Sequence, residues 1–175
     1  MVAYIKKRSF IHHRPEVESE LLRIKRNPSF RKATENMLYS YLIMKELTSE
    51  ISPIVDSSQI GLILYTTHGE LESTCQFLKF YAEKGLSRPI YFQNSLHHST
   101  LGFIAQKFAI LGPSYTIPVE SNDQEPLERR SLDLFDHLDV SFLIAQYIDT
   151  KICSSLPLEL GKDENDSFGH LIGSK

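Results

Sequence analysis

The chain has 175 residues, enough for one domain with a hydrophobic core. Apolar residues make up 41% of it and charged residues 23%, as in an ordinary soluble globular protein, and the formal net charge of -3 gives no global sign of nucleic-acid binding. No apolar run approaches the roughly 20 residues that span a bilayer, no secretory-type apolar segment opens the sequence, and two cysteines are too few for a disulfide scaffold. We therefore expect a cytoplasmic protein without a membrane span.

In the first third of the chain, an extended or loosely ordered segment at 1–14 precedes two predicted helices. Residues 15–26 fit a short helix, because a proline suits its first turn and acidic residues precede basic ones. Asn27 can cap a second, longer helix whose first position is Pro28. Apolar residues then recur at helical spacing, which indicates one buried face, and the Ser-Pro pair at 52–53 ends the helix.

A buried strand comes next, because residues 60–65 form a continuous apolar run that is too short for a helix. A turn leads into a helix over 71–85, which Gly85 closes as a C-terminal cap. Residues 88–92 are interpreted as a short extended piece.

The segment 94–109 predicts a further helix. Asn94 or Ser95 can cap it through a side-chain oxygen, and Gly102 in its middle permits close approach by a neighbouring helix or strand. After a Gly-Pro turn, the pattern predicts a short strand over 114–119, an amphipathic helix over 125–138 and a second buried strand over 140–148.

Helices that alternate with buried strands predict an α/β fold with a mostly parallel central sheet flanked by helices. The sequence contains no internal repeat and no clear linker, so residues 1–160 are predicted to form one domain. The remaining residues, 161–175, are polar and predict a mobile tail.

The segment FQNSLHHSTLGFIAQKFAILGPSYTI at 92–117 carries the most specific pattern in the chain. It resembles the N-terminal half of β-ketoacyl synthases, which have the thiolase fold, and looks most similar to the short chain-length factors of aryl-polyene-type fatty acid or polyketide synthases. Those proteins carry a run F-H-N-S-V-H-N-x-x-x-G, followed later by an A/G-P-S turn. The matching residues here are Phe92, Asn94, Ser95, His97 and Gly102, and then Gly112, Pro113 and Ser114. His98 stands where asparagine is usual.

Three further segments resemble the same family in the same order. They are the arginine-rich RIKRNPSFRKATENML, the strand and glycine turn IGLILYTTHGELEST, and VSFLIAQYIDTKICSSLPL, which resembles a strand that ends V-A-Y-D. The resemblance covers roughly residues 23–158. It implies half of a thiolase-fold monomer, with residues 92–121 at a subunit interface.

In active ketosynthases the same turn and strand lead to a nucleophilic cysteine, whose thiolate is stabilised by a helix N-terminus. Counting from Gly112 puts Ser121 at that position. A serine hydroxyl is a much weaker nucleophile than a thiolate and needs a base beside it; the neighbour in sequence is Glu120. We therefore interpret Ser121 as a helix-capping residue and assign no catalytic residue.

The other residues that active ketosynthases need, a cysteine in its motif and two histidines, are not matched by the cysteines and histidines of this sequence. Cys153, in the run CSS, lies after the second buried strand, and a Leu-Pro pair then blocks the helix that the family's cysteine motif requires. Active ketosynthases also use two histidines from the second half of the fold, which we do not find in this sequence. We interpret His97 as a structural hydrogen-bonding residue and Cys75 as a small core residue.

Nothing in the sequence predicts a metal or a cofactor. The pair His12-His13 lacks further ligands at metal spacing. There is no P-loop, dinucleotide-binding fingerprint or nucleophile elbow. Basic and aromatic residues are not interleaved as in RNA-binding sheets.

The resemblance implies a non-catalytic, chain-length-factor-type partner of an active β-ketoacyl synthase, which assists acyl chain elongation on acyl carrier protein. A physical argument also points to a partner, because half of such a fold leaves a sheet edge and apolar helix faces to be covered by a ketosynthase subunit or by a second copy of the chain. Two alternatives stay open. One is an acyltransferase or thioester hydrolase that uses Ser121 or Cys153, and the other is a vestigial, self-associating protein without acyl function.

Overall fold

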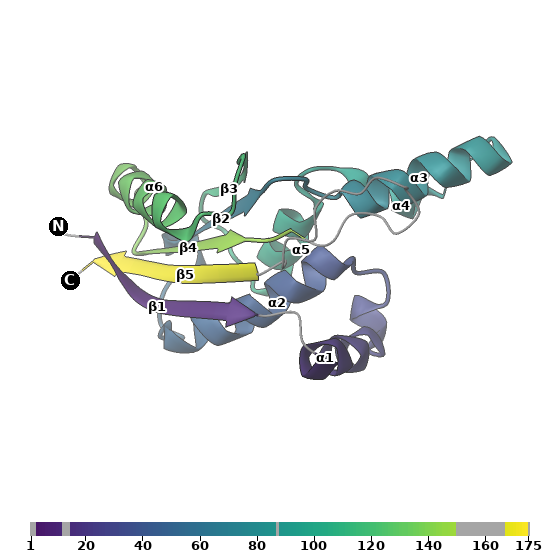
Figure 1. Cartoon of the computed structure of the whole chain (residues 1–175). Helices are drawn as coiled ribbons and strands as arrows, with labels where there is room; N and C mark the ends of the chain where they lie inside the picture. Colours follow the sequence, from purple (N-terminus) through teal and green to yellow (C-terminus); the bar gives the residue numbers. More distant parts are fainter. Residues whose placement is uncertain (1–2, 12–14, 87, 150–166, 175) are drawn as a thin grey trace.

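The computed structural model describes residues 3–11, 15–86, 88–149 and 167–174, which form an α/β fold around one five-stranded sheet (Figure 1). In chain order the elements are β1 (Ala3–Ile11), α1 (Pro15–Lys25), α2 (Glu35–Leu47), β2 (Ile60–Thr66), α3 (Leu71–Lys84), α4 (Pro89–Ser95), α5 (Ser99–Lys107), β3 (Ser114–Pro118), α6 (Gln124–His137), β4 (Phe142–Tyr147) and β5 (Ser167–Ser174). The predicted α/β class is confirmed. Among the described helices, none is long and apolar enough to cross a membrane.

The sheet has a parallel core with an antiparallel extension. Its strand order is β1-β5-β4-β2-β3, and β2 is parallel to both β3 and β4. β5 runs antiparallel to β4, and β1 runs antiparallel to β5. Parallel strands that helices cover on both faces read as continuous apolar runs, so the sequence predicts β2 and β4 correctly.

The C-terminal strand β5 corrects the predicted mobile tail at 161–175. Residues 167–174 lie inside the sheet between β1 and β4, and their apolar side chains, such as Leu171, are buried. The polar residues before β5 and the glycines within it hide the strand pattern, but pairing on both sides makes it an interior strand. Gly169 is required, because a Cβ there would lie 2.6 Å from Ile43 of α2. The folded domain therefore extends beyond its predicted boundary.

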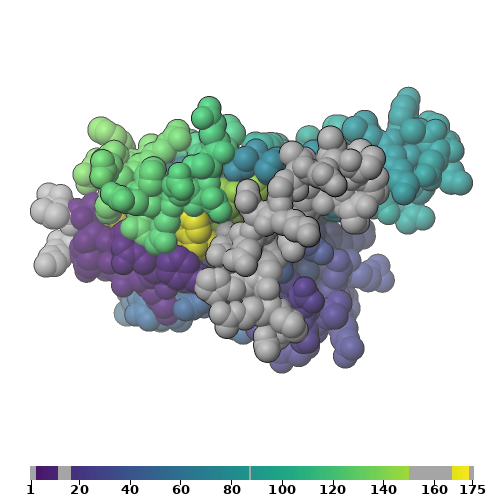
Figure 2. All heavy atoms as spheres, in the orientation of Figure 1, coloured from purple at the N-terminus to yellow at the C-terminus, as the bar shows by residue number. Residues whose placement is uncertain are grey.

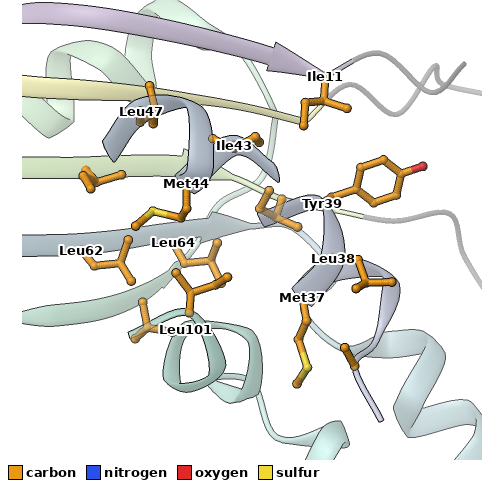
Figure 3. Close-up of a cluster of buried hydrophobic side chains, with 14 of the residues drawn as sticks. Ile11, Met37, Leu38, Tyr39, Ile43, Met44, Leu47, Leu62, Leu64 and Leu101 are labelled. Atoms are coloured by element: carbon orange, nitrogen blue, oxygen red, sulfur yellow. The ribbon is translucent and has the colours of Figure 1, made fainter. Parts of the chain in front are cut away.

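Helices cover both faces of the sheet, with α2 and α5 on one side and α6 on the other (Figure 1). β2 serves both layers, because successive side chains of a strand point to opposite faces. Leu62 and Leu64 pack in the α2 layer, where Figure 3 shows them beside Met44. Ile63 and Tyr65 pack with α6. Each face of β2 is thus buried by a different helix layer.

The start of the second helix differs from its prediction. Asn27 does act as a cap, but of a 3₁₀ turn at Pro28–Phe30, where its Oδ1 accepts a hydrogen bond from the Ser29 N–H at 3.0 Å. α2 begins later, with Thr34 as its cap. The Thr34 Oγ1 accepts from the Met37 N–H at 3.3 Å. The predicted single helix is therefore a short turn followed by a longer helix.

The segment after α3 also differs from its prediction. The extended piece expected at 88–92 is wrong, because α4 begins at Pro89, a residue that suits a first helical turn. The single helix expected at 94–109 is instead the end of α4 and the separate helix α5. Asn94 and Ser95 close α4 and do not start a helix.

Together, α3 and α4 form a helical hairpin that projects from the body of the protein, and we call it the helical arm (Figures 1 and 2). α3 ends as predicted at Gly85, whose φ of +66° is left-handed and whose N–H donates to the Tyr81 carbonyl at 2.8 Å. α3 packs mainly on α4, for example through Phe77 and Phe92, whose ring centroids are 5.8 Å apart.

Candidate functional site

The motif segment at 92–117 packs against the turn that follows β2. The centre of the contact is Gly69, which has a left-handed φ of +61° and lies under the His97 imidazole, so that a Cβ at this position would collide with the ring. Two hydrogen bonds hold the turn in place. The Gly69 N–H donates to Thr66 Oγ1 at 2.8 Å, and Asn36 Nδ2 donates to the Gly69 carbonyl at 2.8 Å. Two segments that the sequence singles out separately are therefore one structural unit.

A buried carboxyl group lies under this unit. Glu70 is only 5% exposed and accepts a hydrogen bond from Thr100 of α5. Burial raises the pKa of Glu70, and hydrogen bonds from Thr100, Thr34, Asn36 and Ser73 partly oppose the rise. The sequence alone does not reveal Glu70 as a buried group, because no local pattern separates a buried glutamate from an exposed one.

The remaining motif residues have structural roles of different kinds. Asn94 Nδ2 donates to the Lys32 carbonyl at 3.1 Å, and Ser95 Oγ donates to the Phe92 carbonyl at 2.7 Å. Gly102 is exposed and a Cβ there would meet no described atom within 4 Å, so the expected close approach is wrong.

The Gly-Pro-Ser turn fastens β3 to β2. A Cβ at Gly112 would collide with the Ile60 carbonyl, so only glycine fits. The Pro113 carbonyl accepts from the Leu62 N–H at 2.9 Å, and β3 begins at Ser114. His97 and His98 are both exposed, and a purely structural role for His97 stays a prediction.

Ser121, which the resemblance places at the position of the ketosynthase cysteine, lies in an exposed loop between β3 and α6. Ser121 Oγ donates to Asp123 Oδ2 at 3.0 Å. The N-cap position of α6 is Asp123, so the interpretation of Ser121 as the cap is wrong. Cys153 and the pair His12-His13 lie outside the described residues. Cys75 is half-buried on α3 and does not belong to either described hydrophobic cluster, so its interpretation as a small core residue is wrong.

A histidine–aspartate pair lies where β2 and β4 end. His68 follows β2 by two residues, Asp149 follows β4 by two residues, and their Nδ1 and Oδ2 atoms are 2.9 Å apart. The same Oδ2 accepts from the His68 N–H at 3.2 Å and from the Tyr147 hydroxyl at 3.2 Å. The Tyr147 hydroxyl also lies 3.0 Å from Thr67 Oγ1. Asp149 is 5% exposed, whereas the His68 side chain is 39% exposed.

No motif marks this pair, although the sequence carries a signal for it. Both residues come shortly after buried runs, and the carboxyl ends of neighbouring parallel strands meet at one edge of a sheet. No described group of three or more histidine, cysteine or acidic side chains is arranged to hold a metal ion.

A second polar cluster lies on the α6 side of the sheet. Arg8 of β1 binds the Glu128 carboxylate through two hydrogen bonds of 2.8 and 3.0 Å, which lowers the pKa of Glu128. His170 of β5 is 1% exposed, and its Nδ1 lies 3.7 Å from Glu128 Oε1. Burial lowers the pKa of His170 to about 4, so the ring is neutral at pH 7.

The outer edge of β3 is free among the described strands, since β2 is its one described neighbour. Pro113 and Val119 bond to β2 through their backbone, so residues 113, 115, 117 and 119 face β2, and 114, 116 and 118 face outward. Pro118, which has no N–H, fits an outward position. Leu111 is 74% exposed and Tyr115 49%, so large apolar side chains lie exposed in and just before this edge.

A scan against protein-family models finds no match, and no curated protein is significantly similar in sequence. The fold itself is known. The chain superposes with a TM-score of 0.72 on one chain of the complex of the ketosynthase ApeO with its chain length factor ApeC from Xenorhabdus doucetiae, at 14% identity, covering 100% of this chain and 80% of that one. It superposes on the ishigamide ketosynthase/chain length factor with a TM-score of 0.77 at 10% identity, covering 99% of this chain and 62% of that one.

A third structure is AntDE:AntF, a type II polyketide synthase acyl-carrier protein in complex with its ketosynthase bound to the hexaketide, with a TM-score of 0.65 at 11% identity, covering 99% of this chain and 58% of that one. The chain thus spans less than two thirds of the length of the second and third structures. The prediction of a ketosynthase-like fold is confirmed.

Proposed function

We propose that the chain is a non-catalytic, chain-length-factor-type subunit that pairs with an active β-ketoacyl synthase and assists acyl chain elongation on acyl carrier protein in fatty acid or polyketide synthesis of the aryl-polyene type. The observation that carries the proposal is the free edge of β3, which begins at the Gly-Pro-Ser turn and has exposed apolar side chains beside it. An unpaired strand edge is a template for pairing with another chain.

The surroundings of Ser121 support a role without cysteine-type catalysis. Its hydroxyl is exposed and donates to a carboxylate in a loop, whereas an acyl-transfer nucleophile requires a base held and oriented beside it. An acyltransferase or hydrolase that uses Ser121 therefore gains no support from these contacts. Two of the superposed structures are described as ketosynthases with a chain length factor, which supports a ketosynthase as the partner.

Co-expression with a ketosynthase from the same genome tests this function. A tagged copy of the chain should retain the ketosynthase through affinity purification and a wash at 0.5 M salt, because an apolar strand-edge interface is insensitive to screening. Recovery of the chain alone, or only as a pair of identical chains, would overturn the proposal and favour the self-associating alternative.

A further inference from the structure

Helix α3 of the helical arm carries apolar side chains on two opposite faces. One face packs on α4, where Phe77 lies against Phe92 and Phe80 against Tyr91, with the ring centroids of each pair 5.8 Å apart. The other face, which we call the outer seam, consists of Leu71, Cys75, Leu78 and Ala82. Because a helix has about 3.6 residues per turn, the outer seam lies on the side of α3 nearly opposite Phe77 and Phe80.

The outer seam has the spacing of a face that pairs with another helix. Its members follow one another at intervals of four, three and four residues, which is the apolar spacing of two-stranded coiled coils. Leu71 at its start is half-buried, whereas Leu78 and Ala82 toward the tip of the arm are exposed. The main described neighbour of α3 is α4, on the opposite face, and the arm projects from the body of the protein (Figure 1). The outer seam is therefore open to one further helix.

The charges beside the outer seam indicate which helix fits there. Glu72 and Lys79 lie on the same flank of the seam. In an antiparallel pair of α3 helices related by a twofold axis, Leu71 of one copy faces Ala82 of the other. Glu72 of each copy then lies beside Lys79 of the other, so opposite charges meet twice. The Glu72 carboxylate already accepts a hydrogen bond from Gln76 Nε2 at 2.8 Å, but a carboxylate has room for further donors. A parallel pair would place this flank against the opposite flank of the second copy, where α3 has no charged residue.

We infer that the outer seam binds the outer seam of a second copy of this chain, with the two α3 helices antiparallel. The seam faces away from α4, and the β3 edge belongs to the sheet, so this contact and the proposed contact with a ketosynthase use different surfaces. Two heterodimers can then join through their arms, and each ketosynthase still has one copy of this chain. The inference rests on α3 alone and does not depend on the proposed function.

Sedimentation velocity of the purified full chain, over a range of loading concentrations, tests the contact. The wild type should form a dimer, and Leu78→Glu should raise its dissociation constant about tenfold or more, because the change places a carboxylate in the apolar seam. Leu22→Glu is the matched control, because Leu22 is an exposed leucine on α1, outside the arm, and should leave the constant unchanged. A wild type that stays monomeric, or the same constant in the two variants, overturns the inference.

Charge reversal separates a second copy of the chain from any other occupant of the seam. At low ionic strength, Glu72→Lys or Lys79→Glu alone brings like charges together and should weaken the dimer several-fold. The double variant restores opposite charges in an antiparallel pair and should recover the wild-type dissociation constant. The recovery cannot come from α3 itself, because a lysine in its first turn opposes the helix dipole in the single and the double variant alike. A double variant as weak as the single ones would overturn the antiparallel pairing and assign the seam to a different protein.

Discussion

Gly69 connects the turn after β2 to the motif segment, and a single methyl group tests that connection. Its φ of +61° disfavours any other residue, and the His97 ring fills the space of the missing side chain. We expect Gly69→Ala to lower the free energy of unfolding by about 2–3 kcal/mol, because left-handed strain and a displaced ring act together. Urea unfolding followed by circular dichroism measures this loss.

The control is Gly85→Ala. Gly85 has a similar φ of +66°, but an added Cβ would meet nothing within 4 Å. It should lose only the strain component, about 1 kcal/mol. Equal losses in the two variants would show that the contact with His97 contributes nothing.

His170 predicts a pH dependence of stability. Its pKa is about 4 in the folded protein and 6.5 in an unperturbed chain, so the folded state binds fewer protons. The free energy of unfolding is therefore highest above pH 6.5, where the ring is neutral in both states, and falls as the pH drops toward 4. Between pH 7 and pH 5 the loss from His170 is about 2 kcal/mol. Other groups, including Glu70 with its raised pKa, also titrate, so the quantity to compare is the pH slope of the wild type against that of His170→Gln.

Chemical unfolding at pH 5, 6 and 7 gives both slopes. Between pH 7 and pH 5, the free energy of unfolding of His170→Gln should fall by about 2 kcal/mol less than that of the wild type. Parallel slopes would mean that the ring is protonated equally easily in the folded and unfolded chains.

At the scale of elements, the free edge of β3 can be blocked without harming its bonds to β2. The backbone of Thr116 faces outward, so Thr116→Pro removes an unpaired N–H and leaves the β2–β3 hydrogen bonds in place. We expect this variant to fold but to bind the ketosynthase at least tenfold more weakly, as measured by biolayer interferometry. Thr116→Ala keeps the N–H and should bind like the wild type. Equal binding by both variants would move the interface away from this edge.

The elements that the sequence predicts well are those whose apolar pattern reflects their own burial. β2 and β4 are covered on both faces and appear as continuous apolar runs. β5 is equally buried, but Gly169 and His170 interrupt its pattern, and its place in the sheet depends on pairing with β1 and β4. The sequence does not predict α4, because its seven residues are too few to show helical periodicity.

The same distinction applies to the sites. The motif residues from Phe92 to Ser114 could be found because they lie together in the sequence. His68 and Asp149 are 81 residues apart, and only the parallel pairing of β2 and β4 brings them together. Glu70 and Thr100 likewise meet through the packing of α5 on the turn.

For the whole molecule, the exposed apolar side chains on the helical arm and beside β3 are the surface that a partner should cover. Tyr81 and Leu78 of the arm are each 56% exposed, and Phe92 is 54% exposed. Patches of this kind on a folded protein indicate contact with another protein. A heterodimer that uses residues 92–121 would bury Phe92, Leu111 and Tyr115 together with the β3 edge.

The most direct test of this account is the mass of the species that co-purifies with a ketosynthase from the same genome, measured by size-exclusion chromatography with light scattering. We predict one complex that contains one copy of this chain for each ketosynthase chain and remains intact on dilution. A monomer or homodimer of this chain that elutes apart from the ketosynthase would contradict the account.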